Sequence, residues 1–293
     1  MKEKICWRYK YFATASLDEA YKDGLFNVAI DLRKFEGKSS KNQTLSLSLL
    51  NAEGNVVYAA SKSVTRQTQN VNFSTRIKDV LTWSAETPNL YRYVIKLSDN
   101  NESQVISKKI GFRKVEIKDS QLMINGQPLI VNGVNLHEHH QTKGHAPDRA
   151  TMLEDITLMK RNNINAIRMS HYPHDPYLYS LCDEYGIYVV DEANIETHAM
   201  GAEFQAGFDK AKHLAYLPEW APAHLDRIER MFHQDKNHSS IIIWSMGNEC
   251  GNGPVFHDAY QWLKAIDTTR FVQFEQAGQD YNTDIVAPMY PRI

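Results

Sequence analysis

The sequence has few cysteines, and they are poorly placed to form disulfide bonds or to bind a metal together. Its three cysteines, Cys6, Cys182 and Cys250, are odd in number and widely spaced, with no Cys-x-x-Cys pair. This pattern argues against a disulfide framework and against a zinc ribbon. We therefore expect free thiols in a reducing compartment.

An excess of charge of either sign is also missing. The 33 Lys and Arg residues are balanced by 35 Asp and Glu residues, a net charge of −2. A balanced surface offers no electrostatic basis for a nucleic-acid or anionic-membrane partner. With 42% hydrophobic residues in 293, the chain has the composition of a globular protein of about two domains.

No hydrophobic run approaches the length of a membrane-spanning helix. Residues 1–10 carry the positive charge of a signal peptide, but the apolar stretch that should follow is absent. We therefore expect no membrane association and a cytoplasmic location. A leader preceding residue 1 would make the location periplasmic instead.

Short alternating runs broken by polar turns fill the first third of the chain. Period-two strands at this spacing, without a helical stretch, indicate an antiparallel, immunoglobulin-like β-sandwich over residues 1–117. Hairpin turns are expected by composition at 51–55 and 98–102. The expected strands are 25–32, 44–50, 56–58, 71–73 and 91–97. The apolar and aromatic loop 81–91 is expected to serve packing.

The remaining residues, 118–293, alternate strand and helix after a hairpin at Asn125-Gly126. This alternation predicts a parallel sheet, with polar residues following each strand as in a (β/α)8 TIM barrel. Six of eight strands are expected, so the barrel would be incomplete. The expected strands are 129–135, 165–170, 187–191, 241–244, 271–275 and 284–290, and the expected helices are 150–162, 177–185, 222–234 and 255–266.

The apolar run after Ser240 ends in Ser-Met-Gly-Asn-Glu. A buried parallel strand here would deliver Asn248 and Glu249 to its carboxyl end, where such folds carry out chemistry. Gly251 and Gly253 would let the backbone turn tightly and leave space for a ligand. The alternative is that Glu249 caps the helix that begins near Pro254.

Polar residues also follow the three preceding strands of the second region. Each could be a hydrogen-bonded structural residue or a helix cap, but a barrel places four consecutive strand ends around one pocket. The segments are 135–140, 168–174, 191–198 and 248–249. The His-Glu-His-His segment at 137–140 is not the His-Glu-x-x-His motif of zinc proteases. Glu196 and His198 would project to the same side of an extended backbone. With Glu249 they would form an oxygen-rich site suited to magnesium rather than zinc.

Four blocks together resemble the signature of glycoside hydrolase family 2, in particular its bacterial β-galactosidase branch. They are Asn-Gly-Val-Asn-Leu-His-Glu-His-His at 132–140, Ile-Arg-Met-Ser-His-Tyr-Pro-His at 167–174, Val-Val-Asp-Glu-Ala-Asn-Ile-Glu-Thr-His at 189–198 and Ile-Ile-Trp-Ser-Met-Gly-Asn-Glu at 242–249. The segments 83–91 and 111–113 resemble the end of that family's sandwich domain. The resemblance implies a retaining β-glycosidase with a β-galactoside substrate.

The resemblance also implies a role for each matching residue. Glu249 matches the general acid/base, Asn248 its sugar-contacting neighbour, and Arg168 an arginine beside the nucleophile. The other matches are His137 and His171 for sugar hydroxyls or the transition state, Tyr290 for an active-site tyrosine, and Glu196, His198 and Glu249 for a magnesium site. The family's sodium ligands are expected to lie outside this chain.

The family's nucleophile, a glutamate in a Cys-Glu-Tyr type block, has no match in this sequence. Glu275 is the late glutamate that could replace it, and a structural role is expected for Glu275. We therefore expect a β-galactosidase fragment that is inactive alone, belonging to a full-length homo-oligomer.

Three alternatives stay open. The same scaffold serves β-glucuronidases and β-mannosidases, and activity on glucuronides would favour the first of these. A non-catalytic carbohydrate-binding or assembly fragment would regain activity when the missing segment is supplied in trans. A metalloprotease, the weakest alternative, would need tight zinc at His137 and His139.

Overall fold

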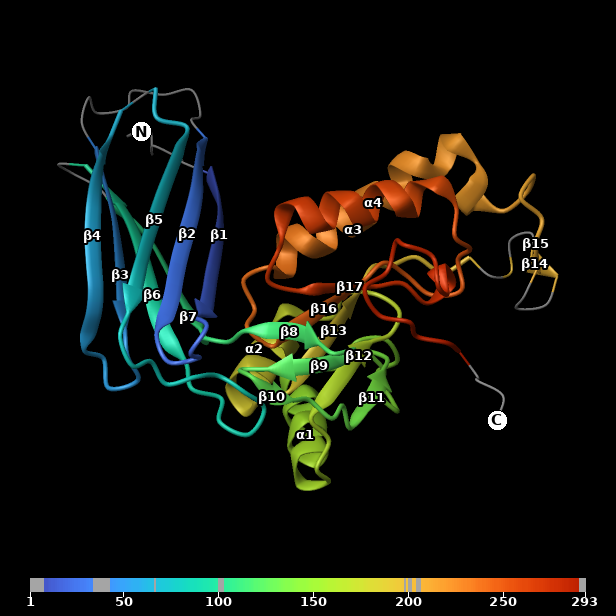
Figure 1. The fold of residues 1–293 in the computed structure, drawn as a ribbon, viewed down its shortest axis with the longest axis horizontal. Helices are drawn as coiled ribbons and strands as arrows, with labels where there is room; N and C mark the ends of the chain where they lie inside the picture. The colour runs from blue at the N-terminus through green and yellow to red at the C-terminus, as the bar shows by residue number, and fades with distance from the viewer. Residues whose placement is uncertain are drawn as a thin grey trace. The chain divides into compact units, whose positions relative to one another are not determined.

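The computed structural model describes residues 8–33, 43–65, 67–99, 103–197, 199, 202–203 and 207–289. The chain divides into two compact units, Met1–Leu129 and Ile130–Ile293 (Figure 1). None of the helices in these described ranges combines the length and apolar character needed to cross a bilayer.

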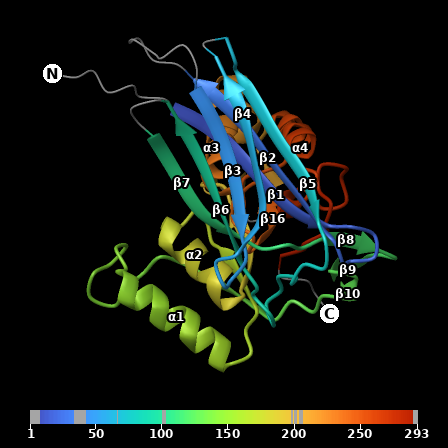
Figure 2. The same ribbon diagram turned by 90° about the vertical axis from the view of Figure 1, so that its left-hand side faces the viewer.

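The first unit contains the predicted β-sandwich, with two antiparallel sheets (Figure 2). One has the order β1-β2-β5 and the other β4-β3-β6-β7. Side chains from both sheets form one core cluster. The strands are β1 (Arg8–Leu17), β2 (Gly24–Arg33), β3 (Gln43–Leu50), β4 (Val56–Val64), β5 (Asn70–Ile77), β6 (Tyr91–Ser98) and β7 (Ser103–Ile110).

The alternation of leucine and serine along β3 places its leucines in this core. Leu45, Leu47 and Leu49 are fully buried and alternate with serines. Burying each leucine contributes about 1.5–3 kcal/mol. The loop 81–91 serves packing as predicted, because Trp83 is also fully buried. A Cβ atom at Gly111 would lie 2.4 Å from Trp83, so this position accepts only glycine.

A small hairpin ends the first unit. It consists of β8 (Val115–Lys118), β9 (Gln121–Ile124) and β10 (Gln127–Pro128). Asn125 and Gly126 join β9 to β10 with φ angles of +50° and +77°. Asn-Gly is the pair that favours two successive positive φ values, so the predicted hairpin is confirmed.

The second unit is built on a parallel sheet with the order β11-β12-β13-β16-β17. Helices connect its strands, and α3 and α4 lie side by side (Figure 1). The strands are β11 (Gly133–Leu136), β12 (Ala166–Met169), β13 (Tyr188–Glu192), β16 (Ile241–Ser245) and β17 (Phe271–Gln273), and the helices are α1 (Arg149–Arg161), α2 (Pro176–Tyr185), α3 (Ala221–Asp235) and α4 (Pro254–Ile266). This is the arrangement of a partial TIM barrel.

Shorter elements complete the unit. They are β14 (Ala202–Glu203), β15 (Gly207–Phe208), η1 (Leu214–Tyr216), η2 (Pro218–Trp220) and η3 (Glu275–Ala277). Two helices begin at aspartate caps: Asp148 accepts from the Thr151 amide and Asp175 from the Tyr177 amide. These side chains satisfy amide groups that lack a partner within the helix.

The sixth strand predicted at 284–290 is wrong for the described residues, which form five parallel strands. Only an isolated bridge joins Ile285 to Gln273. The Asp284 carboxylate accepts from the Val272 amide at 2.8 Å, and the Thr283 hydroxyl accepts from the Phe274 amide at 3.1 Å. These two side chains therefore accept hydrogen bonds from backbone amides of β17 and the residue after it. In a sixth strand, backbone carbonyl groups would have accepted them instead.

A pair of buried carboxyl groups links β13 to α3. Asp191 of β13 and Asp235 of α3 are 0% and 1% exposed. The Tyr179 hydroxyl donates to Asp191 Oδ1 at 2.6 Å. Burial raises the pKa of both carboxyls, and the charge of Asp191 raises the pKa of Asp235 further. The pair therefore shares a proton rather than ionising fully.

This pair is expected to make the free energy of unfolding fall as the pH rises. The folded pKa values lie above the unfolded value of about 3.9, so the folded chain binds more protons and loses stability with rising pH. Asp235→Asn keeps a hydrogen-bond donor without a titrating proton, so its stability should fall less between about pH 5 and about pH 8. Urea unfolding across this range tests the difference, with the exposed Asp226→Asn as control. Equal pH dependence in the wild type and Asp235→Asn would contradict it.

Candidate active site

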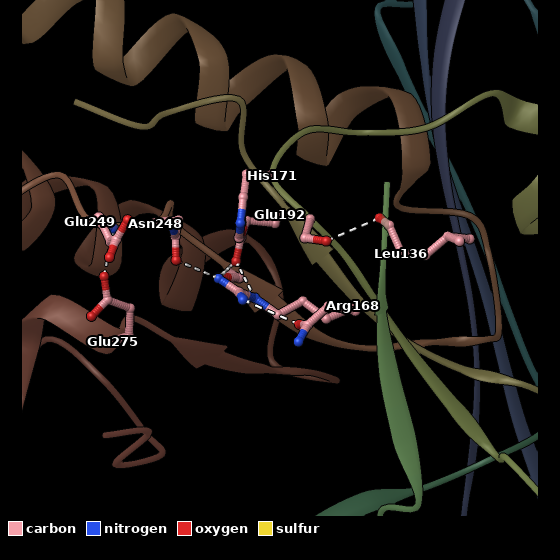
Figure 3. Close-up of polar contacts among 10 residues, drawn as sticks. Leu136, Arg168, His171, Glu192, Asn248, Glu249 and Glu275 are labelled. Atoms are coloured by element: carbon pink, nitrogen blue, oxygen red, sulfur yellow. Dashed lines mark hydrogen bonds and ion pairs between the residues drawn. The ribbon is translucent and has the colours of Figure 1, made fainter. Parts of the chain in front are cut away.

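The carboxyl ends of four parallel strands lie at one edge of the second unit's sheet. Leu136 of β11 is in register with Met169 of β12, and Glu192 of β13 with Ser245 of β16. The polar segments that follow these strands therefore meet at the same edge (Figure 3).

Glu192, the last residue of β13, is the buried centre of the polar contacts at this edge. Its Oε2 accepts from Arg168 Nε and Ser245 Oγ, both at 2.7 Å. Its Oε1 lies 2.6 Å from His171 Nδ1 (Figure 3). The Glu192 side chain is 0% exposed, so one carboxylate anchors three side chains from β12, β16 and the segment after β12.

Arg168 carries the network across the sheet. Its second terminal nitrogen donates to Asn248 Oδ1 at 2.9 Å, and its first to Asn135 Oδ1 at 3.3 Å. Asn248 is 2% exposed. The guanidinium therefore connects three strands with the residue that directly precedes Glu249.

Glu249 adopts an uncommon backbone conformation. Its φ is +43°, and its amide donates to Glu275 Oε1 at 2.6 Å. Gly247 has a φ of +145°, and a Cβ there would lie 2.9 Å from the Ile195 carbonyl oxygen. A non-glycine residue with positive φ costs about 1–3 kcal/mol and tends to occur at functional sites. The Glu275 contact helps to hold this turn.

The alternative that Glu249 caps α4 is wrong. The N-cap of α4 is Gly253, and no side chain makes a capping hydrogen bond there. A Cβ at Gly253 would lie 1.8 Å from the Ala215 carbonyl oxygen, so glycine is required by packing.

Glu275 lies on η3, beside the Glu249 backbone (Figure 3). Burial raises the pKa of this carboxyl group. Its Oε2 accepts from Gln276 Nε2 at 2.7 Å. Both carboxyl oxygens are therefore engaged in hydrogen bonds.

Imidazole and phenol rings gather next to this network. The rings of His137 and His171 are 5.3 Å apart between centroids, and Tyr172 lies 6.1 Å from His137. Burial lowers the pKa of His137, and the neighbouring His171 and His139 lower it further. His137 is therefore neutral at pH 7 and can bind a hydroxyl without adding charge.

Glu196 lies beside the turn that carries Asn248 and Glu249. It forms a parallel bridge with Asn248, whose backbone amide donates to the Ile195 carbonyl oxygen at 2.9 Å. The main chain thus brings Glu196 next to Glu249, two of the three residues expected to bind magnesium. The third, His198, lies outside the described residues, as does Tyr290. Within the described ranges, no group of three or more His, Cys, Asp or Glu residues is arranged to hold a metal.

The cysteines take no part in this arrangement. Cys182 and Cys250 are free and fully buried, and burial raises the pKa of both thiols well above its usual value. The expected free thiols are confirmed at these two positions, while Cys6 lies outside the described residues.

Sequence reasoning missed the contacts of Glu192, Ser245 and Glu275. A signal was present for Glu192, because it ends a strand that is hydrophobic on both faces. An acidic residue buried in such a strand requires a positive or donor-rich partner. Arg168, on the neighbouring strand, is that partner.

Both units match known protein families. Residues 9–113 match the sequence model described as "Glycosyl hydrolases family 2", and residues 115–293 match the one described as "Glycosyl hydrolases family 2, TIM barrel domain". The β-galactosidase of Pseudoalteromonas haloplanktis is 45% identical over 299 residues, and that of Vibrio vulnificus strain CMCP6 is 42% identical over 289. Each alignment covers 96% of this chain and 27% of the relative, so the chain spans about a quarter of the length of these curated relatives.

Solved structures share the fold. A β-glucuronidase from Parabacteroides merdae superposes with a TM-score of 0.77 at 19% identity, over 92% of this chain and 33% of that one. A β-glycosidase from Bacteroides vulgatus superposes with a TM-score of 0.77 at 25% identity, over 94% of this chain and 34% of that one.

Proposed function

Because the chain belongs to glycosyl hydrolase family 2, we propose that it supplies the acid/base half of a retaining β-galactosidase site, with Glu249 as the general acid/base. The observation that carries this proposal is the turn Gly247-Asn248-Glu249. It is held at the carboxyl edge of the sheet by Arg168 and Glu275. The relatives at 41–45% identity are named β-galactosidases, which supports galactosides as substrates.

Retaining hydrolysis needs two carboxyl groups about 5 Å apart. In the first step Glu249 would protonate the departing glycosidic oxygen while the second carboxylate attacks the anomeric carbon. In the second step Glu249 would remove a proton from the water that releases the sugar. His137 and Asn248 would bind sugar hydroxyls without introducing net charge, and His171 is proposed to bind a sugar hydroxyl as well.

Glu275 is a poor candidate for the attacking carboxylate. A nucleophile must be ionised, whereas burial raises the pKa of Glu275. Both of its oxygens already accept hydrogen bonds. We therefore expect the nucleophile to be another residue and the 293-residue chain alone to be inactive.

Magnesium is proposed as the cofactor, held by Glu196, His198 and Glu249. Two carboxylates on adjacent backbone segments suit a hard divalent cation. When bound, the ion would supply positive charge that orients the acid/base carboxylate. Tyr290 is proposed to contact the substrate, sodium to bind through residues outside this chain, and the full-length protein to be a homo-oligomer.

A β-glucuronidase or β-mannosidase of the same family is the main alternative. Likeness to β-glucuronidase structures at 19% identity concerns the fold alone. A glucuronide carries a carboxylate, which calls for a cation in the pocket. Arg168 is already engaged by Glu192 and Asn248, and this favours an uncharged sugar.

The test is a comparison of aryl β-D-galactoside, β-D-glucuronide and β-D-mannoside hydrolysis by the natural full-length polypeptide that contains these residues. The expected kcat/KM is highest for the galactoside, by at least about 10²-fold. Removal of magnesium with a chelator should lower it, and added magnesium should restore it. The 293-residue chain is assayed in parallel. A preference for the glucuronide would contradict the galactosidase proposal, and sugar binding without turnover would favour the non-catalytic alternative.

A further inference from the structure

Glu192 is fully buried, but its side chain contacts Arg168 and His171, two residues that are expected to bind the sugar. We propose that Glu192 is a positioning residue that fixes the hydrogen-bonding pattern of His171 and Asn248, so that together they recognise uncharged sugar hydroxyls. The identification of the ligand as a sugar rests on the proposed function. The effect of Glu192 on its neighbours follows from the geometry alone.

The first step concerns His171. A carboxylate only accepts hydrogen bonds, so the 2.6 Å contact with Glu192 Oε1 requires a proton on His171 Nδ1. In the neutral ring the other nitrogen, Nε2, is then a bare acceptor. No residue in the described part of the chain hydrogen-bonds to Nε2, and the side chain is 21% exposed. A neutral His171 ring would therefore offer a ligand an acceptor.

The second step concerns Asn248. A guanidinium only donates hydrogen bonds, so the Asn248 atom that faces Arg168 must be the amide oxygen. The amide NH₂ group is left as the donor. Glu192 controls this orientation through Arg168, because its Oε2 accepts from Arg168 Nε at 2.7 Å.

Together His171 Nε2 and the Asn248 side-chain NH₂ group offer one acceptor and one donor. A sugar hydroxyl can donate a hydrogen bond to His171 Nε2 and accept one from the Asn248 NH₂ group. A carboxylate can only accept, so it would leave His171 Nε2 without a partner. The pattern set by Glu192 thus fits a sugar hydroxyl better than a carboxylate group at this position.

Glu192→Gln gives a sharp test of this arrangement, since glutamine has one acceptor and one donor in place of two acceptors. Arg168 and Ser245 both donate to Oε2, so the glutamine oxygen should occupy that position. Its NH₂ group then faces His171 Nδ1. This nitrogen must become an acceptor, and the ring must move its proton to Nε2.

The measurement is the ¹⁵N spectrum of the histidine rings in the 293-residue chain, with His171 assigned from the signals lost in His171→Phe. The expected result is the Nδ1–H form in the wild type and the Nε2–H form in Glu192→Gln. A wild-type ring in the Nε2–H form, or one protonated at both nitrogens, would overturn the proposal even if the variant failed to fold. An unchanged His171 in a folded Glu192→Gln chain would also overturn it.

The chain contains a matched control for this readout. Asp183 is a second carboxylate bound to a histidine, with its Oδ2 2.6 Å from His238 Nδ1 and its Oδ1 accepting from the Ser240 amide at 2.7 Å. Asp183→Asn should move the proton of His238 and leave that of His171 in place. Ser245→Ala, which keeps the Glu192 carboxylate, should leave the His171 proton on Nδ1. A shift of His171 in either control would overturn the specific role of Glu192.

Kinetics of the natural full-length polypeptide separate this inference from the proposed function. Glu192→Gln should lower kcat/KM for the aryl galactoside by about 10- to 100-fold, as the loss of an orienting partner usually does. Most of the loss should appear as a higher KM. An altered His171 ring with unchanged kcat/KM would overturn the role in recognition. Absence of any glycoside turnover in the wild type would refute the proposed function, while the ring spectra would still decide the role of Glu192.

Discussion

Glu249→Gln is expected to lower kcat/KM for lactose, measured in the natural full-length polypeptide, by about 10²- to 10⁴-fold, the usual contribution of general acid/base catalysis. Glutamine is close to glutamic acid in shape but cannot donate a proton to the departing oxygen. The Glu249 amide contact with Glu275 involves the backbone, so the turn should survive the substitution.

The loss should depend on the leaving group. An aryl galactoside with an acidic phenol needs little protonation, so its first step should be affected far less than that of lactose. Glu229, exposed on α3, provides the matched control, and Glu229→Gln should leave both substrates unaffected. An equal loss for both substrates would indicate a damaged pocket rather than a missing acid.

Asp267→Ala is expected to destabilise the chain by about 3–5 kcal/mol, the usual cost of leaving a buried charge unpaired. Asp267 and Arg270 form an ion pair at 2.8 Å with side chains 0% and 4% exposed. Asp267 also accepts from Trp244 Nε1 at 2.9 Å and from the Thr269 hydroxyl at 2.6 Å. The Thr269 amide donates to the same carboxylate at 2.9 Å. Removing the carboxylate therefore leaves four donors without this acceptor, between β16 and the end of α4.

Urea unfolding measures this loss. The exposed Arg230–Asp226 pair, with side chains 78% and 53% exposed, is the matched control, and Asp226→Ala should leave the midpoint almost unchanged. Similar midpoints for Asp267→Ala and the wild type would contradict the expectation.

The ionic state of Asp267 also predicts how its contribution depends on pH. Burial alone would raise the pKa of Asp267, but Arg270 and the hydrogen bonds lower it to about 2. The folded pKa is thus below the unfolded value of about 3.9. The contribution is present above that unfolded value and is lost as the pH falls through about 2.

The periodicity of apolar residues in the sequence predicted those helices and strands whose buried side chains recur at regular spacing. Strands β2, β3 and β6 alternate apolar and polar residues. The helices α1 to α4, described in the second unit, were predicted within one or two residues of their observed ends. Strands β1 and β7 were missed. In β7 only Ile110 is fully buried, so this edge strand carries almost no apolar pattern.

The candidate site could be predicted in its residues but not in its contacts. Four strand ends and their motifs indicated Arg168, His171, Asn248 and Glu249, and the parallel sheet brings the segments that carry them together. The strand predicted at 284–290 failed because the side chains of Thr283 and Asp284 replace backbone pairing. The central position of Glu192 depends on three side chains that lie 21 to 53 residues away from it in the sequence, and no local pattern encodes it.

The central claim, that Glu249 is the acid/base of a retaining site, is tested most directly by adding azide to Glu249→Gln in the natural full-length polypeptide. A small anion needs no general base to attack a covalent galactosyl intermediate. Turnover of an activated aryl galactoside should recover, and the product should be β-galactosyl azide. The absence of recovery, or an azide of α configuration, would contradict the account.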